Sequence, residues 1–297
     1  MTRKKTLRPR DPDLRAPREP PGKGAPRRPA RDVAAKHPAI EARPPKRDFE
    51  PRGGRMPRAR DVVQIYGFHS DGAALKAPRR TLIRLYATQA AANRLSAEIA
   101  ARGVETRILG ADEIALRAPR GAVHQGVVLE ARPLEPIDIA DLPERGLVVV
   151  LDSVTDPHNV GAILRTAAAF GVDALLTTER HSPEFTGALA KSASGGLEHV
   201  LICSVVNLSR ALTELGELGY LRIGLDSEGA RTIDATPVSR PLALVLGAEG
   251  KGLRRLTREH CDVLARLDMP GAIKSLNVSN ACAVALALVN QKLRAAS

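Results

Sequence analysis

The sequence predicts an α/β protein in which a small domain precedes a larger domain with a mostly parallel sheet. Apolar runs typical of strands alternate with helix-like periodicity in two blocks of the chain. A polar stretch with three prolines separates these blocks. The chain has 297 residues, of which 43% are hydrophobic, so it is long enough to bury a core in each block.

Residues 1–60 differ in composition from the rest of the chain and are predicted to form a disordered basic tail. They contain 19 Lys or Arg and 7 Asp or Glu, whereas the remaining residues contain 26 of each. They also hold 12 of the 22 prolines and lack sustained apolar periodicity, so they cannot bury enough surface to offset the entropy of ordering. Such an arm favours binding to a polyanion, although a tail that only increases solubility would have the same composition.

The first domain is predicted to span residues 61–132. Alternating and three-to-four-residue apolar spacings locate its elements. In chain order these are a strand at 81–88, a helix at 89–102, a strand at 104–109, an Ala-rich helix at 111–116 and a strand at 123–131.

Residues 133–146 are predicted to be a linker, and the second domain is predicted to span residues 147–297. It begins with five consecutive apolar residues at 147–151, which is typical of a strand buried on both faces. Helices are interleaved with the strands, which predicts a parallel sheet covered on both sides. Further strands are predicted at 174–177, 199–206, 221–225, 242–246 and 263–267.

The final helix, predicted at 277–294, is apolar nearly all the way round and therefore needs cover on more than one face. Burial against its own sheet and contact with a second subunit would both explain this pattern.

Composition also limits the class of protein. No apolar span of 18 residues and no secretory segment is present, so we expect a cytoplasmic protein with no membrane partner. Cys203, Cys261 and Cys282 form no CxxC pair, which favours small core residues over metal ligands or nucleophiles. Aromatic residues make up 2% of the chain and Trp is absent, which argues against a base-stacking platform.

Polar residues and glycines follow three strands of the second domain, where open α/β sheets bind ligands. In the first segment, 151–170, Asn159 is predicted to cap the next helix, and Arg165 lies off its apolar stripe. The planar guanidinium of Arg165 could hold a phosphate in a cleft. A helix cap and an ordinary surface arginine would give the same pattern.

The second segment has Gly247, Gly250 and Gly252 directly after a buried strand, which allows unusual backbone angles and close approach of a ligand. Their spacing fits neither a P-loop nor GxGxxG. Glu249 within this turn could accept backbone hydrogen bonds or orient a basic group, or it could be a solvated loop acid.

In the third segment, 265–279, a Pro-Gly turn leaves the last strand, and Ser275 or Asn277 can cap the final helix. Capping of this helix requires only one of these two residues. Two polar groups at a spacing of two, beside the glycine turn, indicate a site.

Three patterns occur in this order: NxGxxxRTA at 159–167, LVLGAEGKGL at 244–253 and MPGxxxSLNVSNA at 269–281. Together they resemble the three motifs of the SpoU/TrmH 2'-O-methyltransferases. Outside them, IYGFHS at 65–70 and VHQGV at 123–127 resemble the substrate-binding domain of the members that methylate a guanosine of 23S ribosomal RNA. The resemblance covers the chain from about residue 61 to its end.

The resemblance implies a SPOUT-type α/β domain with a trefoil knot, S-adenosylmethionine bound within the knot, no metal, and a homodimer joined partly through the final helix. Periodicity could not predict the knot, because threaded chains are nearly absent among folds. The residues implied to contact the cofactor are Gly247, Leu267, Met269 and Leu276. The implied catalytic set is Asn159, Arg165, Glu249, Ser275 and Asn277.

A mechanism follows as a hypothesis. An arginine is a poor general base for the 2'-hydroxyl, because its guanidinium has a reference pKa of about 12.5 or higher and stays protonated. We therefore expect Arg165 to bind the phosphate next to the target and to orient the 2'-hydroxyl. Asn159 would position Arg165 or the ribose, and Glu249 would fix the arginine. Ser275 and Asn277 would shape the pocket.

The implied substrate is a guanosine of 23S ribosomal RNA. Transfer RNA or another ribosomal nucleotide is the alternative that keeps the chemistry. A non-catalytic RNA-binding factor of ribosome assembly is the alternative that removes it. A dinucleotide-dependent dehydrogenase is disfavoured by the missing phosphate-binding fingerprint.

Overall fold

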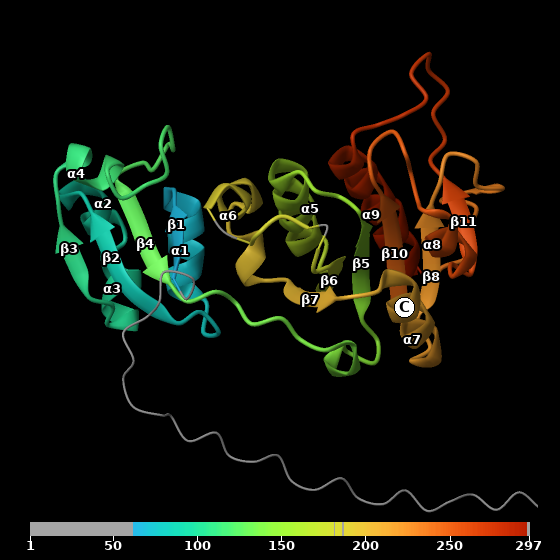
Figure 1. Cartoon of the computed structure of the whole chain (residues 1–297), viewed down its shortest axis with the longest axis horizontal. Helices are drawn as coiled ribbons and strands as arrows, with labels where there is room; N and C mark the ends of the chain where they lie inside the picture. The colour runs from blue at the N-terminus through green and yellow to red at the C-terminus, as the bar shows by residue number, and fades with distance from the viewer. Residues whose placement is uncertain (1–61, 181, 186, 296–297) are drawn as a thin grey trace, which may run out of the picture. The chain divides into compact units, whose positions relative to one another are not determined.

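The computed structural model describes residues 62–180, 182–185 and 187–295. The predicted basic tail at 1–60 lies outside these residues. The described chain forms a four-stranded sheet followed by a seven-stranded sheet (Figure 1).

The four-stranded sheet belongs to the small domain and has the order β1-β4-β2-β3. β4 is antiparallel to β1 and β2, and β2 is parallel to β3. The strands are β1 (Val63–Tyr66), β2 (Leu82–Ala87), β3 (Thr106–Ile108) and β4 (Val127–Ala131). The helices are α1 (Phe68–Lys76), α2 (Gln89–Arg94), α3 (Ser96–Arg102) and α4 (Ala111–Ala115).

The single helix predicted at 89–102 is wrong, because α2 and α3 are separate helices that meet at Leu95. The backbone of Leu95 leaves the helical region, at φ −103° and ψ 12°, and its side chain is buried in the core. Helical hydrogen bonds continue on both sides of Leu95, from its N–H to the Ala91 carbonyl at 3.1 Å and from the Ile99 N–H to its own carbonyl at 2.9 Å. The apolar spacing is therefore nearly unchanged, and the periodicity did not reveal the interruption.

The seven-stranded sheet has the order β7-β6-β5-β10-β8-β11-β9, and every pair of neighbours is parallel. The carboxyl ends of its strands therefore lie along one edge, as the predicted parallel sheet requires. The strands are β5 (Leu147–Asp152), β6 (Ala174–Thr178), β7 (Leu201–Val205), β8 (Leu221–Leu225), β9 (Arg231–Thr232), β10 (Leu242–Gly247) and β11 (Val263–Arg266).

Helices cover both faces of this sheet, and the alternating side chains of β5 show how. Leu147 and Val149 pack in one buried cluster with residues of the helices α5 and α9, whereas Val148 and Val150 pack in another with residues of α7. The helices are α5 (Pro157–Ala169), α6 (Gly187–Ala193), α7 (Leu208–Glu217), α8 (Arg255–Glu259) and α9 (Val278–Ala295), with short 3-10 turns at η2 (Ile139–Asp141) and η3 (Gly196–Glu198).

The last helix, α9, is buried on one face by its own domain. Cys282, Leu286 and Val289 lie in the core next to α5. On another face Val284 is 43% exposed, so a single chain covers only part of this helix. Across the described residues, no helix combines the length and apolar character that crossing a bilayer requires.

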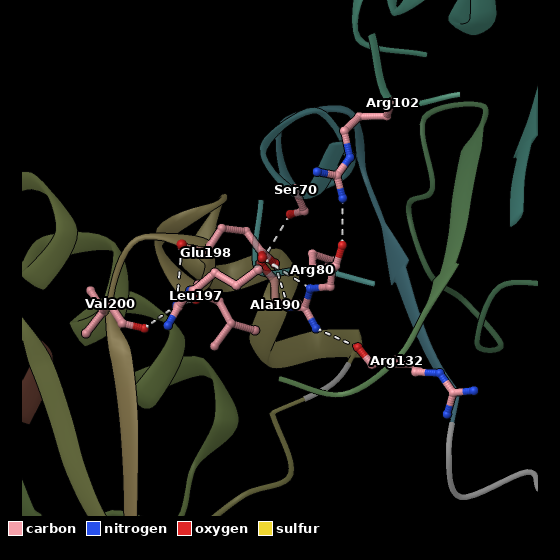
Figure 2. Close-up of polar contacts among 9 residues, drawn as sticks. Ser70, Arg80, Arg102, Arg132, Ala190, Leu197, Glu198 and Val200 are labelled. Carbon is pink, nitrogen blue, oxygen red and sulfur yellow. Dashed lines mark hydrogen bonds and ion pairs between the residues drawn. The ribbon is translucent and has the colours of Figure 1, made fainter. Parts of the chain in front are cut away.

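A buried ion pair connects the small domain to the seven-stranded domain (Figure 2). Arg80, which precedes β2, donates through Nε and Nη2 to the Glu198 carboxylate of η3 at 3.1 and 2.5 Å. The Arg80 and Glu198 side chains are only 1% and 4% exposed. Arg80 also donates to the Arg132 carbonyl at 3.0 Å, and Ser70 of α1 donates to the Ala190 carbonyl of α6 at 3.1 Å.

Candidate active site

A cavity of about 360 Å³ opens at the carboxyl ends of β8, β10 and β11. This volume is within the range of about 300–1,000 Å³ that small-molecule sites occupy. All four residues predicted to contact a cofactor line it, together with Glu249 and Ser275. These four are Gly247, Leu267, Met269 and Leu276.

The glycine turn that forms one wall of the cavity is closed tightly. Gly252 donates its N–H to the Ala248 carbonyl at 2.9 Å, and Gly250 and Gly252 have φ values of 74° and 63°. A Cβ added to Gly247 would lie 2.2 Å from the Gly252 carbonyl carbon. The unusual backbone angles predicted for this segment are therefore present, and main-chain groups of the turn line the cavity.

Three of the five residues predicted to be catalytic meet in one hydrogen-bonded cluster. Glu249 Oε1 accepts from Asn159 Nδ2 at 2.9 Å and from Asn277 Nδ2 at 2.5 Å. Asn277 Nδ2 also donates to Asn159 Oδ1 at 2.9 Å. The three segments that resemble family motifs therefore converge at one point, which we call the amide–carboxylate cluster.

The amide–carboxylate cluster also lies at the start of α9. Glu249 Oε1 is 3.4 Å from the Val278 N–H, the first of the helix. Asn277 Oδ1 accepts from the Ser279 N–H at 2.9 Å, so Asn277 caps this helix, as predicted. A carboxylate at a helix amino terminus is stabilised by the helix dipole, so the negative charge of Glu249 is well placed here.

Asn159 is not the cap of α5, contrary to the prediction. Asp156 Oδ1 accepts from the His158 N–H at 2.9 Å, and Pro157 is the first helical residue. Proline is common at the first position of a helix, because the N–H that it lacks would have no helical partner there. Asn159 lies inside the first turn, and its side chain is therefore available to Glu249.

Arg165 stands apart from the amide–carboxylate cluster. It is six residues beyond Asn159 on α5, which places it roughly 240° further round the helix and about 9 Å along it. Its exposed side chain makes no hydrogen bond or ion pair with any residue that the structure describes. The expectation that Glu249 fixes Arg165 is therefore wrong for the single chain, because the carboxylate binds two amides instead.

The cavity also has an acidic wall that was not predicted from the sequence. Asp226 and Glu228 follow β8 and pair with Arg258 of α8, at 3.3 Å and 3.1 Å. The sequence does contain a signal for this wall. An Asp-Ser-Glu-Gly run directly follows a predicted strand, so it is a polar strand end of the same kind as the three segments that resemble the family motifs.

The cysteines belong to the core, as predicted. Cys203 and Cys282 are buried and Cys261 is partly buried. Burial raises the pKa of each thiol to about 12, so these side chains remain protonated and are poor nucleophiles.

Two family models match the chain. The model of the SpoU rRNA Methylase family matches residues 146–287. The model named RNA 2'-O ribose methyltransferase substrate binding matches residues 64–137.

Curated relatives align over most of the chain. The 23S rRNA (guanosine-2'-O-)-methyltransferase RlmB of Pasteurella multocida is 39% identical over 241 residues, which cover 77% of this chain and 98% of the relative. The protein of the same name from Pseudomonas putida is 38% identical and covers 76% of this chain and 94% of the relative.

Solved structures have the same fold. The SpoU methyltransferase AviRb of Streptomyces viridochromogenes, in complex with AdoMet, superposes with a TM-score of 0.68 at 20% identity, over 78% of this chain and 90% of that one. An rRNA methyltransferase of Sinorhizobium meliloti gives 0.67 at 22% identity, over 78% and 88%. This likeness confirms the predicted fold class.

Proposed function

Because the chain belongs to the SpoU rRNA Methylase family, we propose that it transfers a methyl group from S-adenosylmethionine to the ribose 2'-hydroxyl of a guanosine in 23S ribosomal RNA. The identity of 36% to 39% with curated enzymes of this activity, over nearly their whole length, supports the substrate. The observation that carries the chemistry is the amide–carboxylate cluster of Asn159, Glu249 and Asn277 beside the cavity.

The cavity fits S-adenosylmethionine in its chemistry. Its described wall offers apolar side chains from the ends of β10 and β11 for a flat base, and the main chain of the glycine turn for polar groups. We assign Gly247, Leu267, Met269 and Leu276 to the cofactor. When bound, the cofactor supplies a methyl group on a sulfonium, whose sulfur leaves as a neutral thioether.

The ribose 2'-hydroxyl is a weak acid and must be aligned as its proton is lost. Glu249 holds the two amides in fixed orientations, so Asn159 and Asn277 are pre-organised to position the ribose. Ser275 lines the same cavity, exposed and without a hydrogen-bond partner among the described residues. Arg165, also free of described partners, is assigned to the phosphate next to the target nucleotide.

The active form is proposed to be a homodimer that uses the partly exposed side of α9. Ala281, Val284 and Leu288 follow one another at helical spacing and are half-buried or exposed in the single chain. Ribosomal RNA as the substrate also leads us to propose a cytoplasmic location in bacteria.

The proposed function is tested by methyl transfer from labelled S-adenosylmethionine to 23S ribosomal RNA and to transfer RNA in separate reactions. Mapping of the labelled nucleotide should give one 2'-O-methylguanosine in the ribosomal RNA. Label in transfer RNA alone would keep the chemistry and change the substrate. Cofactor binding without any label would favour a non-catalytic assembly factor.

A further inference from the structure

A second cavity, of about 440 Å³, opens at the carboxyl ends of β6 and β7. Three arginines line it, and none of its described lining residues is acidic. We call it the arginine cavity and define it by Arg180, Arg254, Arg255, Thr178 and Ser209. Two of these arginines are ion-paired, Arg254 with Asp152 and Arg255 with the exposed Glu259 at 2.5 Å, so Arg180 is the unpaired charge of the cavity among the described residues.

The arginine cavity is connected to the candidate active site through the chain itself. The glycine turn at 247–252 lines the first cavity, and residues 254–257 directly after it line the second. Both cavities lie at the carboxyl edge of the same parallel sheet. A polymer that places one nucleotide beside the glycine turn would thus have its neighbouring phosphates near Arg254 and Arg255.

A buried carboxylate fixes Arg254 in this place. Asp152, at the end of β5, is completely buried and accepts from the Arg254 N–H at 2.9 Å and from its Nε at 2.5 Å. The Arg254 side chain is nevertheless 51% exposed, and its two Nη groups have no hydrogen-bond partner within the described chain. An arginine held at Nε with free Nη groups is ready to bind a phosphate.

Other groups around the arginine cavity have unused hydrogen-bonding capacity as well. Arg180 makes no ion pair or hydrogen bond with a residue that the structure describes. The buried hydroxyl of Thr178 has no partner there either. The ten-residue helix α7 begins at the rim, where Asn207 caps it and Ser209 lines the cavity. Its amino terminus adds a partial positive charge.

We propose that the arginine cavity binds a backbone phosphate of the RNA substrate, a few nucleotides from the methylated ribose. This assignment rests on the proposed function, since it takes RNA as the substrate. Cations and hydrogen-bond donors without an aromatic side chain suit a phosphate better than a base. Such a contact positions the RNA without reading its sequence.

The test compares two double variants of the full chain. Arg180→Gln with Arg255→Gln removes two charges from the arginine cavity. Arg254 is kept, because its loss would leave the buried carboxylate of Asp152 without its ion-pair partner. The matched control, Arg145→Gln with Arg231→Gln, removes two exposed charges that precede β5 and begin β9, at the amino edge of the sheet. Each protein is titrated with a 23S ribosomal RNA transcript at several salt concentrations, without S-adenosylmethionine.

The cavity variant is expected to bind the RNA about tenfold or more weakly, and its slope of log affinity against log salt should be smaller by about 1 to 2. Its affinity for S-adenosylmethionine should not change, because neither replaced residue lines the first cavity. Arg180→Gln alone, which breaks no described hydrogen bond, should give about half of the change in slope.

An unchanged salt slope in the cavity variant, or an equal loss in the control, would overturn the proposal. The proposal would also be overturned if the protein bound inorganic phosphate as tightly as it binds the RNA, since that result would indicate a site for a small anion. Because binding is measured without methyl transfer, a wild-type protein that binds RNA but transfers no methyl group would refute the proposed function separately.

Discussion

The Glu249 carboxylate accepts hydrogen bonds from the amides of Asn159 and Asn277, which lie 90 and 28 residues away in the sequence. A charged acceptor makes stronger hydrogen bonds than a neutral one, and this difference keeps both amides in a single orientation. The same oxygen also faces the first N–H of α9. At the scale of one residue, we therefore propose that Glu249 is a positioning group.

Replacing this charge tests that role. Glu249→Gln keeps the shape and one acceptor oxygen but weakens the hydrogen bonds to Asn159 and Asn277, a loss of about 1–2 kcal/mol. Turnover of methyl transfer should fall roughly 5- to 30-fold. Glu217→Gln, at an exposed site at the end of α7, is the control. Equal turnover in the two variants would contradict the positioning role.

Arg165 is assigned to the RNA rather than to the amide–carboxylate cluster, and this assignment has its own test. Arg165→Ala should weaken RNA binding and raise KM, because it removes a phosphate contact. Arg165→Lys should restore part of the affinity, since lysine keeps the charge but loses the two-pronged geometry. Binding and single-turnover rates separate the effects. A large fall in turnover with unchanged RNA affinity would contradict the phosphate contact.

Asp71 of α1 should make the stability of the protein depend on pH. Burial raises the pKa of this completely buried carboxyl well above its ordinary value, so the folded protein keeps a proton that the unfolded chain has lost. Stability should therefore fall as the pH rises above about 3.9, the ordinary pKa of Asp, and continue to fall up to the raised pKa of the folded state.

Asp71→Asn removes this titration and should be more stable than the wild type at neutral pH, with a difference that grows as the pH rises. Urea denaturation between pH 5 and pH 8 measures it, in the range of about 5 to 8 where most proteins are stable. Asp141→Asn, in an exposed turn, should change neither stability nor its slope with pH. Parallel pH profiles for wild type and Asp71→Asn would refute the prediction.

At the scale of secondary-structure elements, α9 offers the clearest prediction. Val284 is 43% exposed, and a charge there would lie in the proposed contact between two subunits. Val284→Asp should convert a dimer into a folded monomer, measured by size-exclusion chromatography with light scattering. Leu218→Asp, at a comparably exposed position after α7, should leave the dimer intact. A wild-type monomer, or a dimeric variant, would exclude α9 as the interface.

The sequence predicted β5, β6 and β10 closely because these strands are mostly apolar and buried along nearly their whole length. It failed where tertiary context decides: at the break of the helix at Leu95, at the two-residue strand β9, and at the four-residue strand β1 with the following α1. The site behaved in the same way. The three segments were found from their polar strand ends, but the cap at Asp156 and the amide partners of Glu249 depend on contacts that spacing cannot supply.

At the scale of the whole molecule, one buried ion pair joins the small domain, which matches the substrate-binding family model, to the large domain with the candidate active site. If the small domain presents the RNA to the large one, as we propose, the Arg80–Glu198 pair bears on both stability and substrate placement. Arg79 strengthens the connection, because its Nη2 donates to the Val200 carbonyl at 3.0 Å. A buried ion pair contributes little net stability, because the cost of removing both charges from water offsets their attraction.

Breaking this pair should be costly, whereas replacing it should not. Glu198→Gln leaves the buried guanidinium of Arg80 without a counter-charge and should lower the free energy of unfolding by about 3–5 kcal/mol. Arg80→Met with Glu198→Met should recover much of that loss in urea denaturation, because no charge remains buried. Glu105→Gln, which breaks only exposed ion pairs, should change little.

The double variant also separates stability from placement. If the pair sets the position of the small domain, KM for ribosomal RNA should stay raised in the double variant even where its stability has recovered, while binding of S-adenosylmethionine is unchanged. A double variant with normal stability and normal KM would mean that apolar packing alone positions the small domain. A double variant no more stable than Glu198→Gln would mean that the two side chains do not act as a pair.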